Sequence, residues 1–348
     1  MRYVIVGAGA VGGAIGGRLH ASGHDVVLVA RGKHYEALRD HGLRLRTPDG
    51  DLVLPVPVVD RPEALELRAD DVLVLAVKTQ DGVTALDTWS SRPVSGGGTA
   101  GERLPLVCAQ NGVEGERLAL RRFRRVLGMC VWLPSTHLEP GVVEAPCAPY
   151  TGALTLGPYP PRRGGRGGAA PGARDVPTAD PVVERIAEGL ERSVFLAPVV
   201  ADVMRWKYAK LLGNLANAVD AVCGPSDEPA ARALIERARA EGTAVLDAAG
   251  IDRASLAEQQ QLRAGKMETR PIGGSPRGGG SSWQSLVRGT GAVEVDYLNG
   301  EIVLLGRLYG VPAPVNEALR RVANACARER RTPGSMTPAE LTAIVDTV

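Results

Sequence analysis

The order of apolar and polar positions divides the chain into two parts. In the first part, short apolar runs predict strands at residues 3–6, 25–29, 72–77 and 105–109, an extended proline-broken stretch at 52–59, and a helix at 12–22. The run at 72–77 is apolar throughout, as expected for a strand buried on both faces of a parallel sheet. This alternation of strands and helices predicts an α/β fold, a Rossmann-type doubly wound parallel sheet.

The second part is predicted to be mostly α-helical. After a helix at 181–192 and a short strand at 194–198, helical patterns cover residues 203–222, 228–249, 283–309, 315–330 and 338–347. We therefore place a boundary near Pro198, which gives an N-terminal cofactor domain, 1–197, and a helical substrate domain, 198–348. Two stretches rich in Gly and Arg, 157–180 and 265–281, are expected to be surface loops, and the second is a candidate lid.

Composition excludes several classes of function. The chain has 348 residues and a net charge of +2, so it is long enough for two domains and has no basic excess to bind nucleic acid or a membrane surface. Its apolar runs have the length of strands, too short to cross a bilayer. Its 5 cysteines are scattered without C-x-x-C pairs, and its 5 histidines lack metal-ligand spacing. We expect a cytoplasmic protein with reduced thiols and no bound metal.

A glycine-rich turn follows the first predicted strand. It reads G-x-G-x-x-G and consists of Gly7, Ala8, Gly9, Ala10, Val11 and Gly12. The first glycine permits the tight turn, the second lets the backbone approach a pyrophosphate, and the third lets the helix pack closely on the strand. The unsatisfied N–H groups of the following helix would face the phosphates. A glycine turn without a ligand is the alternative, but strand, spacing and position together favour a dinucleotide site.

The end of the second strand indicates which dinucleotide is bound. NAD enzymes usually carry an acidic residue there, to bind the ribose hydroxyls. This chain has Arg31 and Lys33 instead, and a guanidinium can pair with a 2′-phosphate. The alternative is a solvated surface arginine. The pattern favours NADPH over NADH.

Two polar residues follow the next two predicted strands. Lys78 comes after the strand at 72–77, and Asn111 after the strand at 105–109. Taken singly, Lys78 is a common kind of surface lysine, and Asn111-Gly112 a common turn pair. Ligands of open α/β sheets bind at the carboxyl ends of the strands, so the shared position of the two residues favours a site.

The helical half contains further candidates. Lys210, Asn214 and Asn217 are spaced to share one face of a helix that is otherwise apolar, although a solvent-facing stripe is the alternative. Ser282 begins a later helix, where a simple N-cap would also explain a serine. Glu294 follows on the same predicted helix and could equally be a surface carboxylate.

These motifs, in this order, resemble the ketopantoate reductase (2-dehydropantoate 2-reductase) family over nearly the whole chain. The resemblance implies a Rossmann domain followed by a helical domain, NADPH as the cofactor, and reduction of a small 2-oxo acid to a 2-hydroxy acid. By resemblance, Lys210 would be the general acid, and Glu294 would orient it or hold the substrate hydroxyl. Asn214 would bind that hydroxyl, Ser282 the substrate carboxylate, and Lys78 and Asn111 would lie where cofactor and substrate meet.

The chain also departs from the family pattern. Ala218 stands where the family has a second asparagine, eight residues after the catalytic lysine, and Asn217 is the nearest amide. Trp283 follows the serine where the family has methionine, and Gly279 replaces an asparagine before it. Ketopantoate remains the leading substrate, with another 2-oxo acid or related carbonyl compound, or a non-catalytic NADPH-binding protein, as alternatives. The sequence does not determine the oligomeric state, and a homodimer is one of the states it allows.

Overall fold

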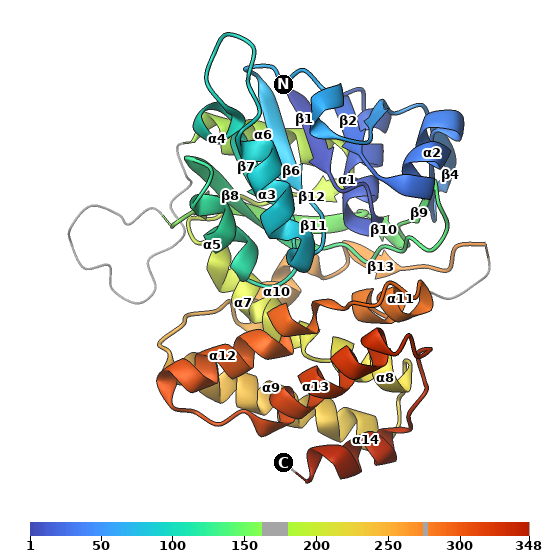
Figure 1. Ribbon diagram of the computed structural model, residues 1–348, viewed down its shortest axis with the longest axis vertical. Coiled ribbons are helices and arrows are strands. Elements are labelled where there is room, and N and C mark those ends of the chain that lie inside the picture. Colours follow the sequence, from blue (N-terminus) through green and yellow to red (C-terminus); the bar gives the residue numbers. More distant parts are fainter. Residues whose placement is uncertain (162–179, 274–277, 348) are drawn as a thin grey trace. The chain divides into compact units, whose positions relative to one another are not determined.

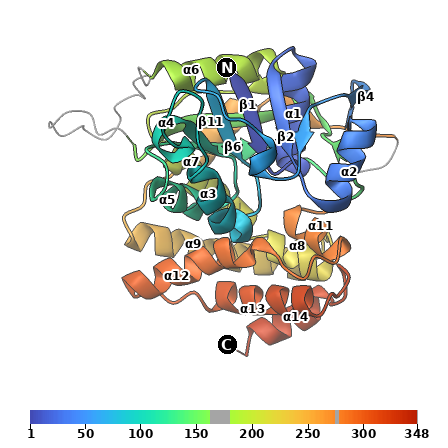
Figure 2. The same ribbon diagram turned by 45° about the horizontal axis from the view of Figure 1, so that its top comes forward.

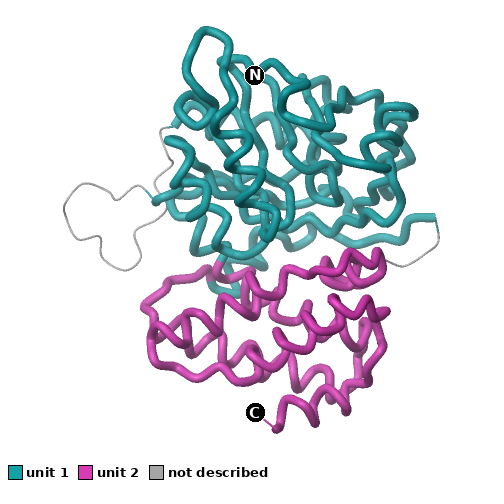
Figure 3. The backbone as a smooth tube through the Cα atoms, in the orientation of Figure 1, with its two compact units in different colours: residues 1–207, 255–276 teal, residues 208–254, 277–348 magenta. Residues whose placement is uncertain are grey.

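The computed structural model describes residues 1–161, 180–273 and 278–347. The chain forms two compact units, one made of residues 1–207 and 255–276, the other of 208–254 and 277–348 (Figure 3). The change of unit at 207/208 lies inside a helix, whereas the expected domain boundary was 197/198. The segment 255–276 belongs to the first unit, although it lies far along the sequence.

The first unit follows the predicted alternation of strands and helices. Its elements up to the last strand of the large sheet are β1 (Arg2–Val6), α1 (Ala10–Ala21), β2 (Asp25–Val29), α2 (Gly32–His41), β3 (Leu43–Thr47), β4 (Gly50–Leu54), β5 (Val58–Val59), η1 (Pro62–Ala64), β6 (Asp71–Leu75), η2 (Thr79–Asp81), α3 (Gly82–Ser90), α4 (Ala100–Arg103), β7 (Pro105–Cys108), α5 (Glu114–Leu120), β8 (Arg125–Trp132), β9 (Val142–Glu144), β10 (Cys147–Pro149), β11 (Gly152–Tyr159), α6 (Pro181–Arg192) and β12 (Phe195–Leu196). The segment 255–276 adds α10 (Leu256–Arg263) and β13 (Met267–Thr269).

One 8-stranded sheet organises this unit, in the order β12-β11-β8-β7-β6-β1-β2-β5 (Figures 1 and 2). The strands from β8 to β5 are parallel, and β11 runs antiparallel to β8, so the sheet is not wholly parallel as the alternation predicted. The chain leaves β1 toward β2 on one side and returns to β6 on the other. This reversal of strand order is the place where open α/β sheets bind ligands.

Both faces of the sheet are buried, which explains the uninterrupted apolar strands. Tyr3 and Ile5 of β1 belong to one core cluster with residues of α1 and α6. Val4 and Val6 belong to a second cluster with residues of α3, α4 and α5. Successive side chains of a strand point to opposite faces, so each face of β1 packs against a different layer of helices (Figure 2).

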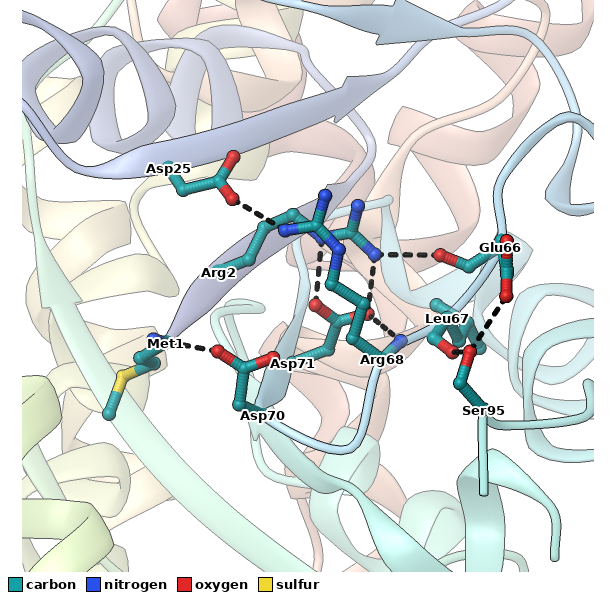
Figure 4. A network of polar contacts seen from close by, with 9 residues as sticks. All are labelled: Met1, Arg2, Asp25, Glu66, Leu67, Arg68, Asp70, Asp71 and Ser95. Carbon is teal, nitrogen blue, oxygen red and sulfur yellow. Dashed lines mark hydrogen bonds and ion pairs between the residues drawn. The ribbon is translucent and has the colours of Figure 1, made fainter. Parts of the chain in front are cut away.

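The amino ends of three strands are tied together by ion pairs (Figure 4). Arg2 in β1 donates from Nε and Nη2 to the carboxylate of Asp71 in β6, at 2.8 and 2.7 Å, and both side chains are buried. Arg68 pairs with Asp25 at the start of β2. These contacts accompany a register in which Arg2 is aligned with both Asp25 and Asp71, so the carboxyl ends of the same strands also lie level.

The second unit is helical. Its elements are the end of α7 (Val203–Asn214), α8 (Asn217–Cys223), α9 (Pro229–Ala248), α11 (Ser281–Val287), η3 (Glu294–Tyr297), α12 (Asn299–Tyr309), α13 (Pro314–Arg328) and α14 (Pro338–Val345). The helices predicted at 228–249, 315–330 and 338–347 are confirmed to within two residues at each end by α9, α13 and α14.

Two long helices were predicted wrongly. The helix expected at 203–222 is divided into α7 and α8, and Leu215 and Ala216 lie in the turn between them. The helix expected at 283–309 is divided into α11, η3 and α12. Gly289 and Gly291 have φ angles of +60° and +76° after the end of α11, a backbone conformation that ends a helix and that glycine adopts without strain.

Several predicted strands and loops also need correction. The extended, proline-broken stretch expected at 52–59 is confirmed, since Pro55 and Pro57 lie between β4 and β5, but the strand expected at 72–77 ends at Leu75. The loop expected at 157–180 begins inside β11, and its part from 162 to 179 lies outside the described residues. The loop expected at 265–281 contains β13, which pairs with β10, and residues 274–277 of this candidate lid also lie outside the described residues.

Candidate active site

The glycine-rich turn connects β1 to α1. The N–H groups of Gly7 and Ala8 both donate to the carbonyl oxygen of Val29, at 3.2 and 3.0 Å, which fixes the turn against the end of β2. Gly7 has φ +101°, and a Cβ there would lie 2.7 Å from the amide nitrogen of Val77. A Cβ on Gly12 would overlap the carbonyl oxygen of Gly7. Two of the three glycines are therefore required by the fold itself.

The middle glycine is different. A Cβ on Gly9 would have no protein atom within 4 Å, so space is open beside this residue. Gly9 is the N-cap of α1, and α1 has no side-chain capping hydrogen bond at this end. Ala10 and Val11, the first residues of α1, are partly exposed. An open surface beside unsatisfied N–H groups at a helix N-terminus is suited to an anionic group such as a pyrophosphate.

The two basic residues expected to bind a 2′-phosphate lie at the start of α2. Arg31 is the N-cap of this helix and Lys33 lies in its first turn, and both are exposed. Val29, the last residue of β2, accepts the hydrogen bonds of the glycine turn, and Arg31 follows it with only Ala30 between them. This is the position where a Rossmann fold contacts the ribose.

Lys78 and Asn111 lie at the ends of neighbouring strands, as predicted. β6 and β7 pair in parallel, and the hydroxyl of Thr79 donates to the carbonyl oxygen of Asn111 at 3.3 Å. The amide of Gln110 donates to the carbonyl oxygen of Val77 at 2.9 Å. The structure therefore joins the two turns by hydrogen bonds, and both Lys78 and Asn111 are half-buried.

A buried ion pair lies beneath the Asn111 turn. Lys207 in α7 forms a short contact with Glu116 in α5 and also donates to the carbonyl oxygen of Gln110 at 3.1 Å. The two residues are 4% and 0% exposed. Burial raises the pKa of Glu116, against the opposing effect of Lys207, and it also raises the pKa of the neighbouring Cys108 thiol. The ammonium group of Lys207 therefore binds Glu116 and the backbone carbonyl of Gln110, the residue before Asn111.

Lys210 and Asn214 share one face of α7. They are four residues apart in an unbroken helix, and both are half-buried. The Nδ2 atom of Asn214 is inaccessible to solvent and has no hydrogen-bond partner among the described residues. A buried donor without a partner costs about 1–3 kcal/mol, so this amide is suited to binding a ligand oxygen.

Asn217 does not continue this face as predicted, because α7 ends at Asn214 and α8 begins at Asn217. The break between them is held by Asn299, whose Nδ2 donates to the carbonyl oxygen of Leu215 at 3.2 Å. The same Nδ2 donates to Asn316 at 3.0 Å. Asn299 and Asn316 are fully buried, so a buried side-chain network binds the turn between α7 and α8.

This network is anchored by a carboxylate. Glu241 in α9 accepts hydrogen bonds from the backbone N–H groups of Val315 and Asn316, each at 2.9 Å. The Nδ2 of Asn316 donates both to Glu241 and to the carbonyl oxygen of Ala238. The start of α13, the middle of α9 and the α7–α8 break therefore form one connected polar cluster.

Asn217 faces the start of the helix that carries Ser282. Its Oδ1 would lie 3.1 Å from a Cβ on Gly280, the N-cap of α11. Ser282 is the second residue of α11 and is buried. Trp283 packs closely over Gly279, where a Cβ would overlap its ring. Ala218, in the position of the expected family asparagine, is also buried. The structure thus brings the Asn217 amide to Gly280, the N-cap of the helix that carries Ser282.

Glu294 is the first residue of η3 and is 4% exposed, so it is not a surface carboxylate. Its neighbour Asp296 is exposed and accepts hydrogen bonds from Arg320 and Asn324, at 3.0 and 2.9 Å. Of the two acidic residues in this segment, Asp296 ties η3 to α13, and Glu294 is the buried one.

Comparison with protein-family models decides the relationship of the chain. The model "Ketopantoate reductase PanE/ApbA" matches residues 3–161, and its C-terminal counterpart matches residues 202–327. The chain belongs to the ketopantoate reductase family. This confirms the resemblance found in the sequence, and the family boundaries leave between them the stretch 162–201.

Relatives and solved structures match most of the chain. A 2-dehydropantoate 2-reductase of Mesorhizobium japonicum is 28% identical and covers 95% of this chain and 99% of its own, and that of Archaeoglobus fulgidus is 29% identical over 91% and 95%. A ketopantoate reductase of Ralstonia eutropha has a TM-score of 0.73 at 25% identity, covering 95% and 100% of the two chains. A D-mandelate dehydrogenase has a TM-score of 0.75 at 19% identity over 95% and 100%, which shows a shared fold.

The sequence did not single out several residues that support the turns of the candidate site. His34, Thr79, Gln110, Lys207 and Asn299 each hold backbone atoms of a turn that carries a candidate residue. Lys207 had a signal, since a lysine in an apolar helix needs a partner. The others are ordinary polar residues whose partners lie far away in the sequence.

Three further findings concern the described residues only. None of the helices there is long and apolar enough to cross a membrane. No group of three or more His, Cys, Asp or Glu side chains in the described ranges could hold a metal ion. The cysteines Cys108, Cys130, Cys147, Cys223 and Cys326 are not in disulfides.

Proposed function

We propose that this protein reduces a small 2-oxo acid to the corresponding 2-hydroxy acid with NADPH, and that the leading substrate is ketopantoate. The main support for this proposal is the face of α7 that Lys210 and Asn214 share. Lys210 is half-buried and lies one turn before Asn214, whose buried Nδ2 has no hydrogen-bond partner among the described residues. A cationic donor beside an amide is suited to a carbonyl oxygen that is about to become a hydroxyl. The names of the full-length relatives support the same reaction.

The cofactor would be held by the first unit, and the residues present fit it. The open space beside Gly9 and the exposed start of α1 suit the pyrophosphate, with the turn from Gly7 to Gly12 as its cradle. Arg31 and Lys33 would pair with the 2′-phosphate, and Lys78 and Asn111 would line the nicotinamide side. When bound, NADPH would supply the hydride for the carbonyl carbon.

The protein's own part in the chemistry would be delivery of a proton. Lys210 would protonate the substrate carbonyl oxygen from Nζ, so that the C=O bond becomes a C–OH group, and it would regain its proton from solvent. Acid catalysis of this kind contributes roughly 10² to 10⁴ in rate. Glu294, whose buried carboxylate is unusual for a glutamate, would orient Lys210 or hold the substrate hydroxyl.

Substrate binding would use the remaining amides and the serine. Asn214 would bind the hydroxyl oxygen, and Ser282 the substrate carboxylate. Asn217 would take the place of the family's second asparagine, since it reaches the start of α11 from α8. We infer that residues 1–197 serve the cofactor and 198–348 the substrate, and that the protein works in the reducing cytoplasm, where its 5 cysteines stay unpaired. A homodimer is the oligomeric state to test first.

A panel of 2-oxo acids tests the proposal. NADPH oxidation is followed at fixed enzyme concentration with ketopantoate, smaller acids such as pyruvate, and bulkier aromatic acids. We expect the highest kcat/KM with ketopantoate. Turnover of another acid without turnover of ketopantoate would remove the leading substrate but keep the reaction. Binding of NADPH with no turnover of any carbonyl compound would favour the non-catalytic alternative.

A further inference from the structure

His34 joins three segments around the glycine turn. It lies in the first turn of α2, three residues after Arg31. Its Nε2 is 2.8 Å from the carbonyl oxygen of Ala8, and its Nδ1 accepts a hydrogen bond from the N–H of Gly141 at 2.9 Å. The ring of His137 lies against it, with 4.1 Å between ring centroids. The imidazole therefore has a polar backbone partner at each nitrogen.

These partners fix the form of the imidazole. The Gly141 N–H can only donate, so Nδ1 must carry a lone pair. The Ala8 carbonyl can only accept, so Nε2 must carry the hydrogen. His34 is thus the neutral Nε2–H tautomer, and it donates to the glycine turn.

The hydrogen bond from His34 to the Ala8 carbonyl oxygen orients the whole Ala8–Gly9 peptide. The Ala8–Gly9 peptide is planar, and in a trans peptide the N–H points opposite to the C=O. Fixing the Ala8 carbonyl toward His34 therefore directs the Gly9 N–H away from the imidazole. The Ala8 N–H is held from the other side by Val29, at 3.0 Å. Both polar groups of Ala8 are fixed by neighbouring elements, and Gly9 is the residue beside which space is open.

We propose that His34 is a positioning residue for the cofactor's pyrophosphate: through the Ala8 carbonyl it holds the Ala8–Gly9 peptide in the orientation that presents the Gly9 N–H. The inference rests on the proposed function only in taking a dinucleotide as the ligand. It differs from the assignment of Arg31, because the pyrophosphate is common to NADPH and NADH whereas the 2′-phosphate is not. Loss of the His34 contact should therefore weaken both dinucleotides equally.

Two substitutions separate the two hydrogen bonds of His34. Glutamine places an amide N–H near the position of Nε2, so His34→Gln keeps the donor for Ala8. Asparagine places an amide oxygen near the position of Nδ1, so His34→Asn keeps the acceptor for Gly141 and loses the bond to Ala8. The matched control is His41→Asn, an exposed histidine at the other end of α2.

The experiment measures dissociation constants for NADPH and NADH, together with Tm, for the full chain. We expect His34→Asn to raise both constants about tenfold, a change of about 1.4 kcal/mol. His34→Gln should stay within about threefold of wild type, and His41→Asn should bind like wild type. Arg31→Ala should weaken NADPH alone.

Other outcomes overturn the inference. Wild-type affinity in His34→Asn would show that the Ala8 contact has no role in binding. Equal losses in the Gln and Asn variants, in proportion to their losses of Tm, would show a purely structural role. If wild type binds dinucleotides but reduces no 2-oxo acid, the proposed function is wrong. The role of His34 is then still decided by the dissociation constants of its variants. If wild type binds neither dinucleotide, both are wrong.

Discussion

The glycine turn of the first unit and the α7–α8 break of the second are both sharp changes of chain direction, but they are built differently. The turn is held mainly by backbone atoms, since the N–H groups of Gly7 and Ala8 bond to the Val29 carbonyl. The break is held by a side chain, because Asn299 bonds to the Leu215 carbonyl from 84 residues away. A turn held by backbone hydrogen bonds requires particular residues, such as glycine, within the turn itself. A turn held by a side chain requires a partner that can lie far away in the sequence.

This difference explains how much of the fold could be predicted. The strands expected at 3–6, 25–29 and 105–109 agree with β1, β2 and β7 to within one residue, because strands buried on both faces need continuous apolar runs. The helix at 203–222 was wrong because apolar residues continue through the break at Leu215 and Ala216, and Asn299, which binds this turn, lies 84 residues away. The break at 288–293 was predictable from its two glycines, Gly289 and Gly291.

The candidate site follows the same division. The glycine turn, Lys78 and Asn111 could be located because strand ends of a parallel sheet share one edge. Lys210 and Asn214 were located by helical spacing within an unbroken helix. Asn217 was assigned to that same helix, and its true neighbour, the start of α11, could not be found without the tertiary structure.

The largest effect is expected at the buried Lys207–Glu116 pair, and it tests whether the stability of the first unit also depends on side-chain contacts. Lys207→Met leaves Glu116 buried without its partner, so we expect the free energy of unfolding to fall by about 3–5 kcal/mol in chemical denaturation. The control is the double variant Glu116→Met with Lys207→Met, which removes both charges and should recover most of that loss. A stable single variant would contradict the importance of the pair for the fold.

The next test concerns the glycine turn itself. Gly9→Ala adds a methyl group to open space, so Tm should stay near wild type while NADPH affinity falls roughly 10- to 100-fold, from an overpacking cost of about 1–3 kcal/mol. Gly12→Ala is the matched control, since its methyl group meets the Gly7 carbonyl and should lower Tm. Unchanged NADPH affinity in Gly9→Ala would mean that the pyrophosphate does not bind there.

A smaller effect is expected at the α7–α8 break. Asn299→Ala removes two buried hydrogen bonds and leaves the Leu215 carbonyl without its side-chain donor, at a cost of about 1–3 kcal/mol of unfolding free energy. The same variant should raise KM for the 2-oxo acid more than it raises the dissociation constant of NADPH. Asn324→Ala, whose partner Asp296 is exposed, should cost only a few tenths of a kcal/mol, about the effect of an ordinary surface change. Equal effects of the two variants would contradict a special role for the break.

The most direct test of the central claim is the kinetics of Lys210→Ala with the 2-oxo acid that wild type reduces fastest. If Lys210 donates the proton, kcat/KM should fall by roughly 10² to 10⁴ while the dissociation constant of NADPH stays unchanged. Activity near the wild-type level would contradict the assignment. So would a loss of NADPH affinity as large as the loss of kcat/KM, because it would make Lys210 a cofactor-binding residue.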